Sequence, residues 1–387
     1  MCDLIIGYTI NDMNIAIDIR ALQQRWGGVP EYTRQVVRAL IDTETTHRYL
    51  LYSNSATGDV GIDLEKEGPH HVVCKTRIPN KLLHSSLIVA KWPGIDALIE
   101  HATGIRPDLL FFPNTHFLAH DRSIPRIVTV HDLSYEHAPD LFSGKSRVWH
   151  VLTHPRDVIA EAAHVIAVSE WTRRDVIASY RIPSERVSVT PLSASASCVG
   201  DVRDRSNRKR VILFDAGNSR KNADVVVQAW MALRVSGALD PAHTLVLTGR
   251  WTHTLRQALA HHVDDSIVFC QPIDDQEREQ FYREAAALLY PSIHEGFGIP
   301  LLEAAHAGVP IITAQHTSIG EVIGTGAYYV DPTNVHDVAR ALRDVLHDRE
   351  LADDLCARAR TAAEKYSWQK TAHLTRAIFE SVMQKVL

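Results

Sequence analysis

Short apolar runs alternate with longer amphipathic stretches along most of the chain. In the first half the apolar runs are rich in β-branched and aliphatic residues, and they fall at residues 15–17, 109–112, 127–130 and 165–168. Runs of this kind predict buried parallel strands. Helical patterns follow at residues 31–41 and 170–180. This order of strand and then helix predicts a doubly wound sheet.

The pattern lapses after Pro191 and then begins again. Residues 193–197 are small serines and alanines, and residues 201–208 are mostly charged, which is typical of a linker. Beyond it, apolar runs alternate once more with helical patterns and predict a second α/β domain, with strands at residues 211–214, 244–248, 267–269, 287–290 and 309–313. A last helical pattern covers residues 368–386.

The predicted fold class is therefore α/β, with two Rossmann-like doubly wound domains that face a cleft. A chain of 387 residues exceeds what one hydrophobic core usually organises. We expect an acceptor domain at residues 1–200, a donor domain at residues 201–365, and a helix at residues 366–387 that packs back toward the first domain. Ligands of this fold class bind at the carboxyl ends of the strands, so the cleft is the expected active site.

Composition and charge narrow the functional classes. Apolar residues make up 45% and charged residues 22%, as in an ordinary globular protein. The net charge is −5 and the basic residues are dispersed, so nucleic acid is not an expected partner. The five cysteines never form a CxxC pair, which argues against a disulfide framework or zinc site and fits a reducing cytoplasm. The first ten residues lack the features of a secretion signal, and the chain contains no apolar run of membrane-spanning length.

The most informative motif is the glycine-containing turn at residues 291–304, which leaves a strand and enters a helix. Gly296 and Gly298 allow the backbone to approach a ligand closely. Pro300 stands where a first helical residue belongs. The amides of Gly298, Ile299 and Leu301 at the helix start can hold an anion, for which a diphosphate is a good candidate.

Two carboxylates flank this turn. Glu295 and Glu303 are separated by seven residues, so both can border one ligand and accept hydrogen bonds from its hydroxyl groups. The alternative is structural: Glu303 complements the helix dipole and Glu295 is solvated.

The sequence EGFGIPLLE resembles the signature of the retaining family 4 glycosyltransferases with the GT-B fold. The resemblance implies that Glu295 binds hydroxyls of the transferred sugar and Glu303 binds the ribose of the nucleotide. It also implies that the amides of the turn meet the sugar and phosphate of the donor, through Gly296, Phe297, Gly298 and Ile299.

A second segment, residues 214–222, is similar to the RKN element of that family. The resemblance implies that Lys221 neutralises the departing diphosphate, since fixed cations stabilise charge that develops on a leaving group. The family often has an arginine where this chain has Asn218, so Arg220 is expected to substitute for it and Asn218 is a candidate neutral donor. Outside this context an Arg-Lys pair is usually a solvated surface.

Three further segments resemble elements of the family. His131 follows a predicted strand within VTVHDL, and the resemblance places it near the transferred sugar; the alternative is a satisfied structural histidine. Gly27 and Gly28 form the first glycine loop, on the phosphate and acceptor side. Ile273 lies in a loop similar to the one that contacts the nucleobase.

The expected activity is metal-independent, retaining transfer of a hexose. The sequence has no Asp-x-Asp element and no clustered metal-ligand set, and a helix start together with Lys221 can replace the ion. No cofactor is expected besides the nucleotide-sugar substrate, for which the resemblance favours GDP-mannose. The acceptor is expected to be a lipid-linked saccharide in cell-surface polysaccharide assembly. Alternatives are a UDP- or dTDP-sugar donor, a sugar-nucleotide epimerase, a glucan synthase, and a non-catalytic binding protein of the same fold.

Residues 75–92 combine apolar side chains with several cations and a tryptophan. Such a segment can rest on an anionic bilayer, which predicts a cytoplasmic protein in peripheral contact with the inner membrane. The alternative is a core-facing helix with solvated Lys and Arg.

Overall fold

The computed structural model describes residues 12–386 apart from Arg25, Thr45, Pro69 and residues 56–67, 196–207 and 251–263. Most of the predicted linker therefore lies outside the described residues. The first ten residues, Arg25 of the glycine loop, and Cys2 and Cys198 also lie outside them.

The first sheet contains seven parallel strands in the order β3-β2-β1-β4-β5-β6-β7. Its strand order reverses between β1 and β4, where Ile15 pairs with Tyr49 on one side and Leu109 on the other. Its strands are β1 (Asn14–Asp18), β2 (Arg48–Asn54), β3 (His71–Thr76), β4 (Leu109–Phe112), β5 (Arg126–Val130), β6 (His164–Ala167) and β7 (Val187–Val189).

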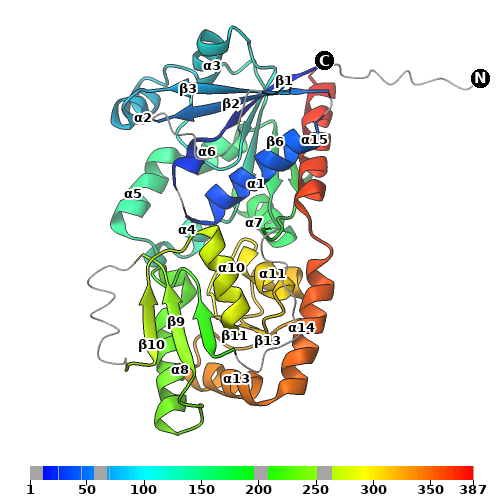
Figure 1. Ribbon diagram of the computed structural model, residues 1–387. Helices are drawn as coiled ribbons and strands as arrows, with labels where there is room; N and C mark the ends of the chain where they lie inside the picture. Colours follow the sequence, from blue (N-terminus) through cyan, green and yellow to red (C-terminus); the bar gives the residue numbers. More distant parts are fainter. Residues whose placement is uncertain are drawn as a thin grey trace, which may run out of the picture.

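Helices and short 3-10 turns connect these strands (Figure 1). They are η1 (Arg20–Gln23), α1 (Gly28–Asp42), α2 (Asn80–Val89), α3 (Ile95–Thr103), α4 (Ser134–His137), η2 (Pro139–Leu141), α5 (Gly144–Thr153), α6 (Pro155–Ala160), α7 (Glu170–Tyr180) and η3 (Ser184–Arg186). The Ser169 hydroxyl accepts the Thr172 amide and so caps the start of α7.

The second sheet repeats the same order with six parallel strands, β10-β9-β8-β11-β12-β13. They are β8 (Arg210–Leu213), β9 (Thr244–Thr248), β10 (Ile267–Cys270), β11 (Ala285–Tyr290), β12 (Ile311–Thr313) and β13 (Tyr328–Tyr329). Between and after them lie η5 (Ser219–Lys221), α8 (Ala223–Val235), α10 (Asp275–Glu284), α11 (Ile299–His306), α12 (Ile319–Ile323), α13 (Val335–His347) and α14 (Arg349–Ala363).

The predicted pair of doubly wound α/β domains is confirmed, since both sheets have the strand order 3-2-1-4-5-6 of nucleotide-binding folds. The sequence patterns did not identify β2, β3, β7 and β13. Strand β7 is only three residues long and β13 only two. Strand β2 ends in the polar pair Ser53 and Asn54, and both are buried. The Asn54 side chain donates to the Ile78 carbonyl, and the Ser53 carbonyl accepts the Thr76 hydroxyl.

The last helix, α15 (Trp368–Gln384), runs from the second domain back along the first, where it packs against α1 (Figure 1). Phe379 meets Phe111 of β4 with ring centroids 5.1 Å apart, and both side chains are fully buried. Near the start of the helix, the Trp368 indole donates to the Ala194 carbonyl at 3.0 Å. The chain therefore connects its two domains a second time through α15.

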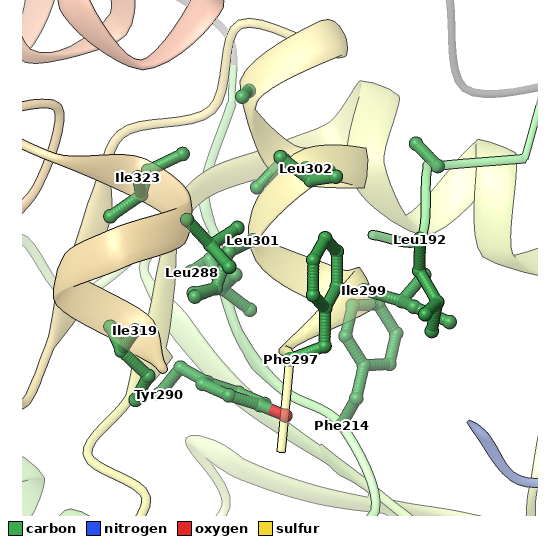
Figure 2. Close-up of a cluster of buried hydrophobic side chains, with 14 of the residues drawn as sticks. Leu192, Phe214, Leu288, Tyr290, Phe297, Ile299, Leu301, Leu302, Ile319 and Ile323 are labelled. Atoms are coloured by element: carbon green, nitrogen blue, oxygen red, sulfur yellow. The ribbon is translucent and has the colours of Figure 1, made fainter. Parts of the chain in front are cut away.

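One apolar cluster continues from the first domain through the second. Figure 2 shows the part around α11, where Phe297, Ile299 and Leu301 surround the helix start and Leu192, which follows β7, is drawn with them. Phe297 also packs edge-on against Tyr366, with ring centroids 5.5 Å apart. The turn that the sequence predicts to bind the donor is thus anchored by buried apolar side chains.

Candidate active site

The carboxyl-end edges of the two sheets meet where His131 follows β5 and Gly296 follows β11. A Cβ atom built on Gly296 would lie 1.8 Å from the His131 carbonyl oxygen. The Thr172 hydroxyl of α7 is within hydrogen-bond distance of both the His131 and Gly296 carbonyls, at 3.3 and 3.4 Å. The two domains are therefore in backbone contact at the predicted site.

Further contacts hold the domains together at this edge. The Glu321 carboxylate of α12 accepts the Glu170 and Trp171 amides at 2.8 and 3.1 Å, so it caps the start of α7 from the other domain. The Ser219 hydroxyl donates to the Leu141 carbonyl at 2.5 Å.

Arg220 forms an ion pair across the domains with Asp132. Its Nη1 lies 2.9 Å from Asp132 Oδ2 and 3.0 Å from the Ser134 hydroxyl. Burial would raise the pKa of Asp132, but the charge of Arg220 and the bonds from Ser134 outweigh it and lower that pKa to about 2. Asp132 is thus ionised, and Arg220 is already paired in this structure.

Lys221 and Glu295 form the second ion pair of the site. Lys221 Nζ lies 2.5 Å from Glu295 Oε1 and also donates to the Tyr290 hydroxyl. Both residues are buried. Burial opposes ionisation of Glu295, but Lys221 and then Arg220 outweigh this effect and hold its pKa below the ordinary value. The structure therefore brings together two residues that are 74 positions apart.

The turn after β11 is fixed from several sides. The Glu295 carbonyl accepts the Ser318 hydroxyl at 2.9 Å, and Gly298, with φ of +95°, caps α11. Glycine tolerates this left-handed backbone, which other residues rarely adopt. Ile299 is the first helical residue and Pro300 the second, so the sequence placed the helix start one residue late.

The amides at this turn are only partly available. The Leu301 amide donates to the Gly298 carbonyl at 3.0 Å, so the expectation that it would be free for an anion was wrong. This hydrogen bond closes a tight turn at the start of the helix. Within the described part of the chain, the Gly298 and Ile299 amides have no backbone partner.

Glu303 lies in α11 and is fully buried. Its carboxylate accepts the Arg278 guanidinium at 3.1 Å and the Tyr282 hydroxyl at 2.9 Å. Neither partner is among the predicted site residues, although their spacing of four residues puts them on one face of α10. Because the carboxylate is fully buried, a ribose hydroxyl could reach it only if a side chain that covers it moved.

His131 is held by the main chain just after the neighbouring strand β4. Its Nε2 lies 2.9 Å from the Pro113 carbonyl, which only accepts, so Nε2 carries the proton and Nδ1 of the neutral ring does not. Burial lowers the pKa of His131. The ring meets the edge of Tyr32 with centroids 4.9 Å apart, and Tyr32 belongs to α1, which follows the glycine loop.

The remaining predicted residues have local contacts. Gly27 has φ of +124° and caps α1, and Gly28 begins the helix. Asn218 Oδ1 accepts the Arg220 amide at 3.2 Å and its Nδ2 bonds to Asp215, so its side chain shapes the turn that presents the cations. Ile273 is buried beside the capping box of α10.

The described residues contain no group of three or more His, Cys, Asp or Glu side chains placed to hold a metal ion. In the same described ranges, every helix is too short or too polar to cross a bilayer.

Comparisons with known proteins match both halves of the chain. The model of the glycosyl transferases group 1 matches residues 201–362, and that of Glycosyltransferase Family 4 matches residues 26–193. The solved structure of WaaG, a glycosyltransferase involved in lipopolysaccharide biosynthesis, has a TM-score of 0.68 at 16% identity and covers 94% of this chain and 99% of that one. These matches make the protein a glycosyltransferase of the GT-B fold.

Two curated relatives to which the chain is similar are named as mannosyltransferases. O-antigen chain mannosyltransferase B of Escherichia coli is 25% identical over 276 residues, which are 68% of this chain and 71% of that protein. O-antigen chain mannosyltransferase RfbU of Salmonella typhimurium is 26% identical over 224 residues, 56% of this chain and 60% of that protein. The chain belongs to the family 4 glycosyltransferases and is mannosyltransferase-like.

Proposed function

We propose that the protein is a retaining, metal-independent mannosyltransferase that moves mannose from GDP-mannose onto a lipid-linked saccharide in cell-surface polysaccharide assembly. The observation that carries the proposal is the buried Lys221–Glu295 pair, 2.5 Å between Nζ and Oε1, beside the start of α11. In this pair, Lys221 is a cation that could bind a diphosphate, and Glu295 is a carboxylate that could accept hydrogen bonds from sugar hydroxyls. The names of the two O-antigen relatives support mannose as the transferred sugar.

The diphosphate of the donor would lie against the Gly298 and Ile299 amides, because a helix start favours an anion. Lys221 and Arg220 are paired with Glu295 and Asp132, so the four side chains carry no net charge. A donor diphosphate would draw Lys221 from Glu295, and Glu295 would then accept hydroxyls of the sugar. Ion-pair exchange of this kind can replace a divalent cation.

Transfer would proceed on one face of the sugar. The bond between the anomeric carbon and the phosphate oxygen breaks as the acceptor oxygen bonds to the same carbon from the same side. The acceptor proton passes to the leaving phosphate oxygen, so no enzyme base is required. His131, neutral and fixed by Pro113, would line the sugar side, and Ile273 would contact the base.

A nucleotide-sugar panel tests this proposal. Thermal stabilisation and turnover are measured with GDP-, UDP-, ADP- and dTDP-sugars, with and without a chelator. We expect a preference for GDP-mannose that the chelator does not change, and an α-linked product by NMR. Preference for another donor would refute GDP-mannose as the substrate. Loss of activity with chelator would refute metal independence, and an inverted product would refute retention.

Peripheral membrane contact is the second part of the proposal, and exposed apolar side chains on α2 and on α5 support it. Leu82, Val89 and Trp92 are 64%, 84% and 70% exposed on and after α2. On α5, Val148 and Val151 are also exposed, and Trp149 of the same helix packs against the small core under α2. Helix α2 lies within the segment predicted to rest on a bilayer, residues 75–92, whereas α5 lies outside it.

Flotation with vesicles containing phosphatidylglycerol tests membrane contact. We expect binding that Val151→Glu weakens severalfold, since a carboxylate disfavours both the apolar boundary and the anionic surface. Val235→Glu, at a similarly exposed valine of α8 in the other domain, is the control. Equal binding by both variants, or no binding by the wild type, would remove this part of the proposal.

A further inference from the structure

The first domain contains a polar cavity whose lining includes none of the residues predicted to hold the diphosphate. It measures about 500 Å³, within the range of ligand pockets. Arg20 follows β1, Asn54 ends β2 and Asn114 follows β4, so the cavity lies at the carboxyl ends of these strands, and His84 of α2 and Trp149 of α5 complete its wall. The strand order reverses between β1 and β4, where ligands of open α/β sheets bind.

The cavity lies next to the predicted reacting centre. The Pro113 carbonyl accepts Nε2 of His131, and the next residue, Asn114, lines the cavity. Pro30, in the first turn of α1, also lines it, two residues before the Tyr32 ring that contacts His131. Residues that line the cavity are thus one or two positions away in the sequence from the groups that hold His131, which is predicted to face the transferred sugar.

The charges of the ionised groups at the cavity sum to zero. Arg20 forms a two-bond ion pair with the buried Asp18, with Nε–Oδ1 at 2.9 Å and Nη2–Oδ2 at 2.7 Å. Burial and the charge of Arg20 lower the pKa of His84, and they lower that of His116 to about 3. Of the described residues that line the cavity, only Arg20 is therefore charged at neutral pH, and Asp18 neutralises it.

Several polar groups of the cavity wall have unused hydrogen-bonding capacity. Among the described residues, Arg20 Nη1 is buried without a partner, and the side chains of Asn114 and His84 make no hydrogen bond. Asn54 differs, since its amide is fully used by Ile78, Asn80 and Thr76. An amide and a neutral imidazole each donate and accept, as hydroxyl groups do, and the half-buried ring of Trp149 offers an apolar face.

We infer that this cavity binds an uncharged sugar residue of the acceptor, and that Asn114 and His84 select it over a phosphorylated sugar. The inference rests on the proposed function, whose acceptor it defines further. A phosphate would bring two charges against a wall whose described residues offer no unpaired cation, and burying an unpaired charge is costly. Hydroxyl groups would instead pair with Asn114 and His84.

Ligand-observed NMR with the full-length protein and GDP tests the inference directly. The probes are methyl α-mannoside and mannose 6-phosphate, which share one ring and differ in charge. We expect the neutral probe to bind at least about tenfold more tightly, the change that one lost hydrogen bond or more produces. Equal or tighter binding of the phosphate would overturn the inference.

Variants locate the binding. Asn114→Ala and His84→Ala should each weaken the neutral probe by about tenfold, whereas His101→Ala, at an exposed histidine of α3, should not. Asn114→Lys supplies an unpaired cation and should bring mannose 6-phosphate to at least the affinity of the neutral probe. Unchanged affinities in all three cavity variants would overturn the inference.

The outcome separates the two proposals. Because the probes report binding without turnover, a protein that binds them as expected but uses no nucleotide sugar would refute the proposed function alone. A protein that turns over GDP-mannose, with an acceptor KM unaffected by Asn114→Ala, would refute the cavity assignment alone.

Discussion

Gly296 lies so close to the His131 carbonyl that a Cβ atom at this position would fall 1.8 Å from the oxygen. The two residues come from different domains, and the backbone contact between them sets how closely the two sheet edges approach. Only glycine fits at this position, so the domain contact explains the presence of Gly296 independently of the family motif.

Gly296→Ala should therefore separate the two edges. We expect it to lower the free energy of unfolding by about 1–3 kcal/mol through overpacking, and to reduce turnover more than donor binding. Gly144→Ala is the matched control, since a Cβ there meets nothing within 4 Å. Thermal unfolding and steady-state kinetics of both variants measure the effect; wild-type behaviour of Gly296→Ala would contradict the backbone contact.

The Lys221–Glu295 pair predicts a strong coupling between the two side chains. Lys221→Met leaves Glu295 buried without its cation and should cost about 3 kcal/mol of stability and at least about 100-fold in kcat. The double variant Lys221→Met/Glu295→Gln removes both charges, so it should recover part of the stability but none of the activity. Urea denaturation and turnover of the wild type, the two single variants and the double variant make up a double-mutant cycle, which measures the coupling.

Acid sensitivity should arise in part from His164 of β6. Burial lowers its pKa to about 4 in the folded protein, against 6.5 for an ordinary histidine. Between pH 6.5 and about 4 the unfolded chain holds a proton that the folded one does not, so stability falls as pH falls. The slope per proton is about 1.4 kcal/mol per pH unit.

His164→Gln should remove this slope while it keeps a donor for the Ser188 hydroxyl, which lies 2.9 Å from His164 Nε2. His101→Gln, at an exposed position, should leave it unchanged. Urea denaturation between pH 7 and pH 4 distinguishes the two, and equal slopes for both variants would show that His164 is not responsible.

The packing of α15 on the first domain can be tested at Phe379. Phe379→Ala removes a fully buried ring that packs on Phe111, and should cost about 3–5 kcal/mol. Val386→Ala, beyond the helix and 56% exposed, should cost almost nothing. A small effect at Phe379, measured by chemical denaturation, would mean that α15 contributes little to the first domain.

Local features of the fold were predictable from the sequence. The strands at residues 127–130 and 244–248 and the turn at Gly296 follow from apolar runs and glycine positions within a few residues. Strand β13 escaped detection because two residues carry no periodicity.

Contacts between distant segments were not predictable. Asp132 and Arg220 are 88 residues apart, and a single sequence gives no sign that they pair. The burial of Glu303 against Arg278 and Tyr282 likewise depends on how α10 packs on α11.

The placement of α15 has a consequence for how the protein is made. The ribosome delivers the first domain before α15, so Phe111 and its neighbours acquire part of their apolar cover only when residues 368–384 emerge. The nascent first domain must therefore keep this hydrophobic face open to chaperones until residues 368–384 have been synthesised.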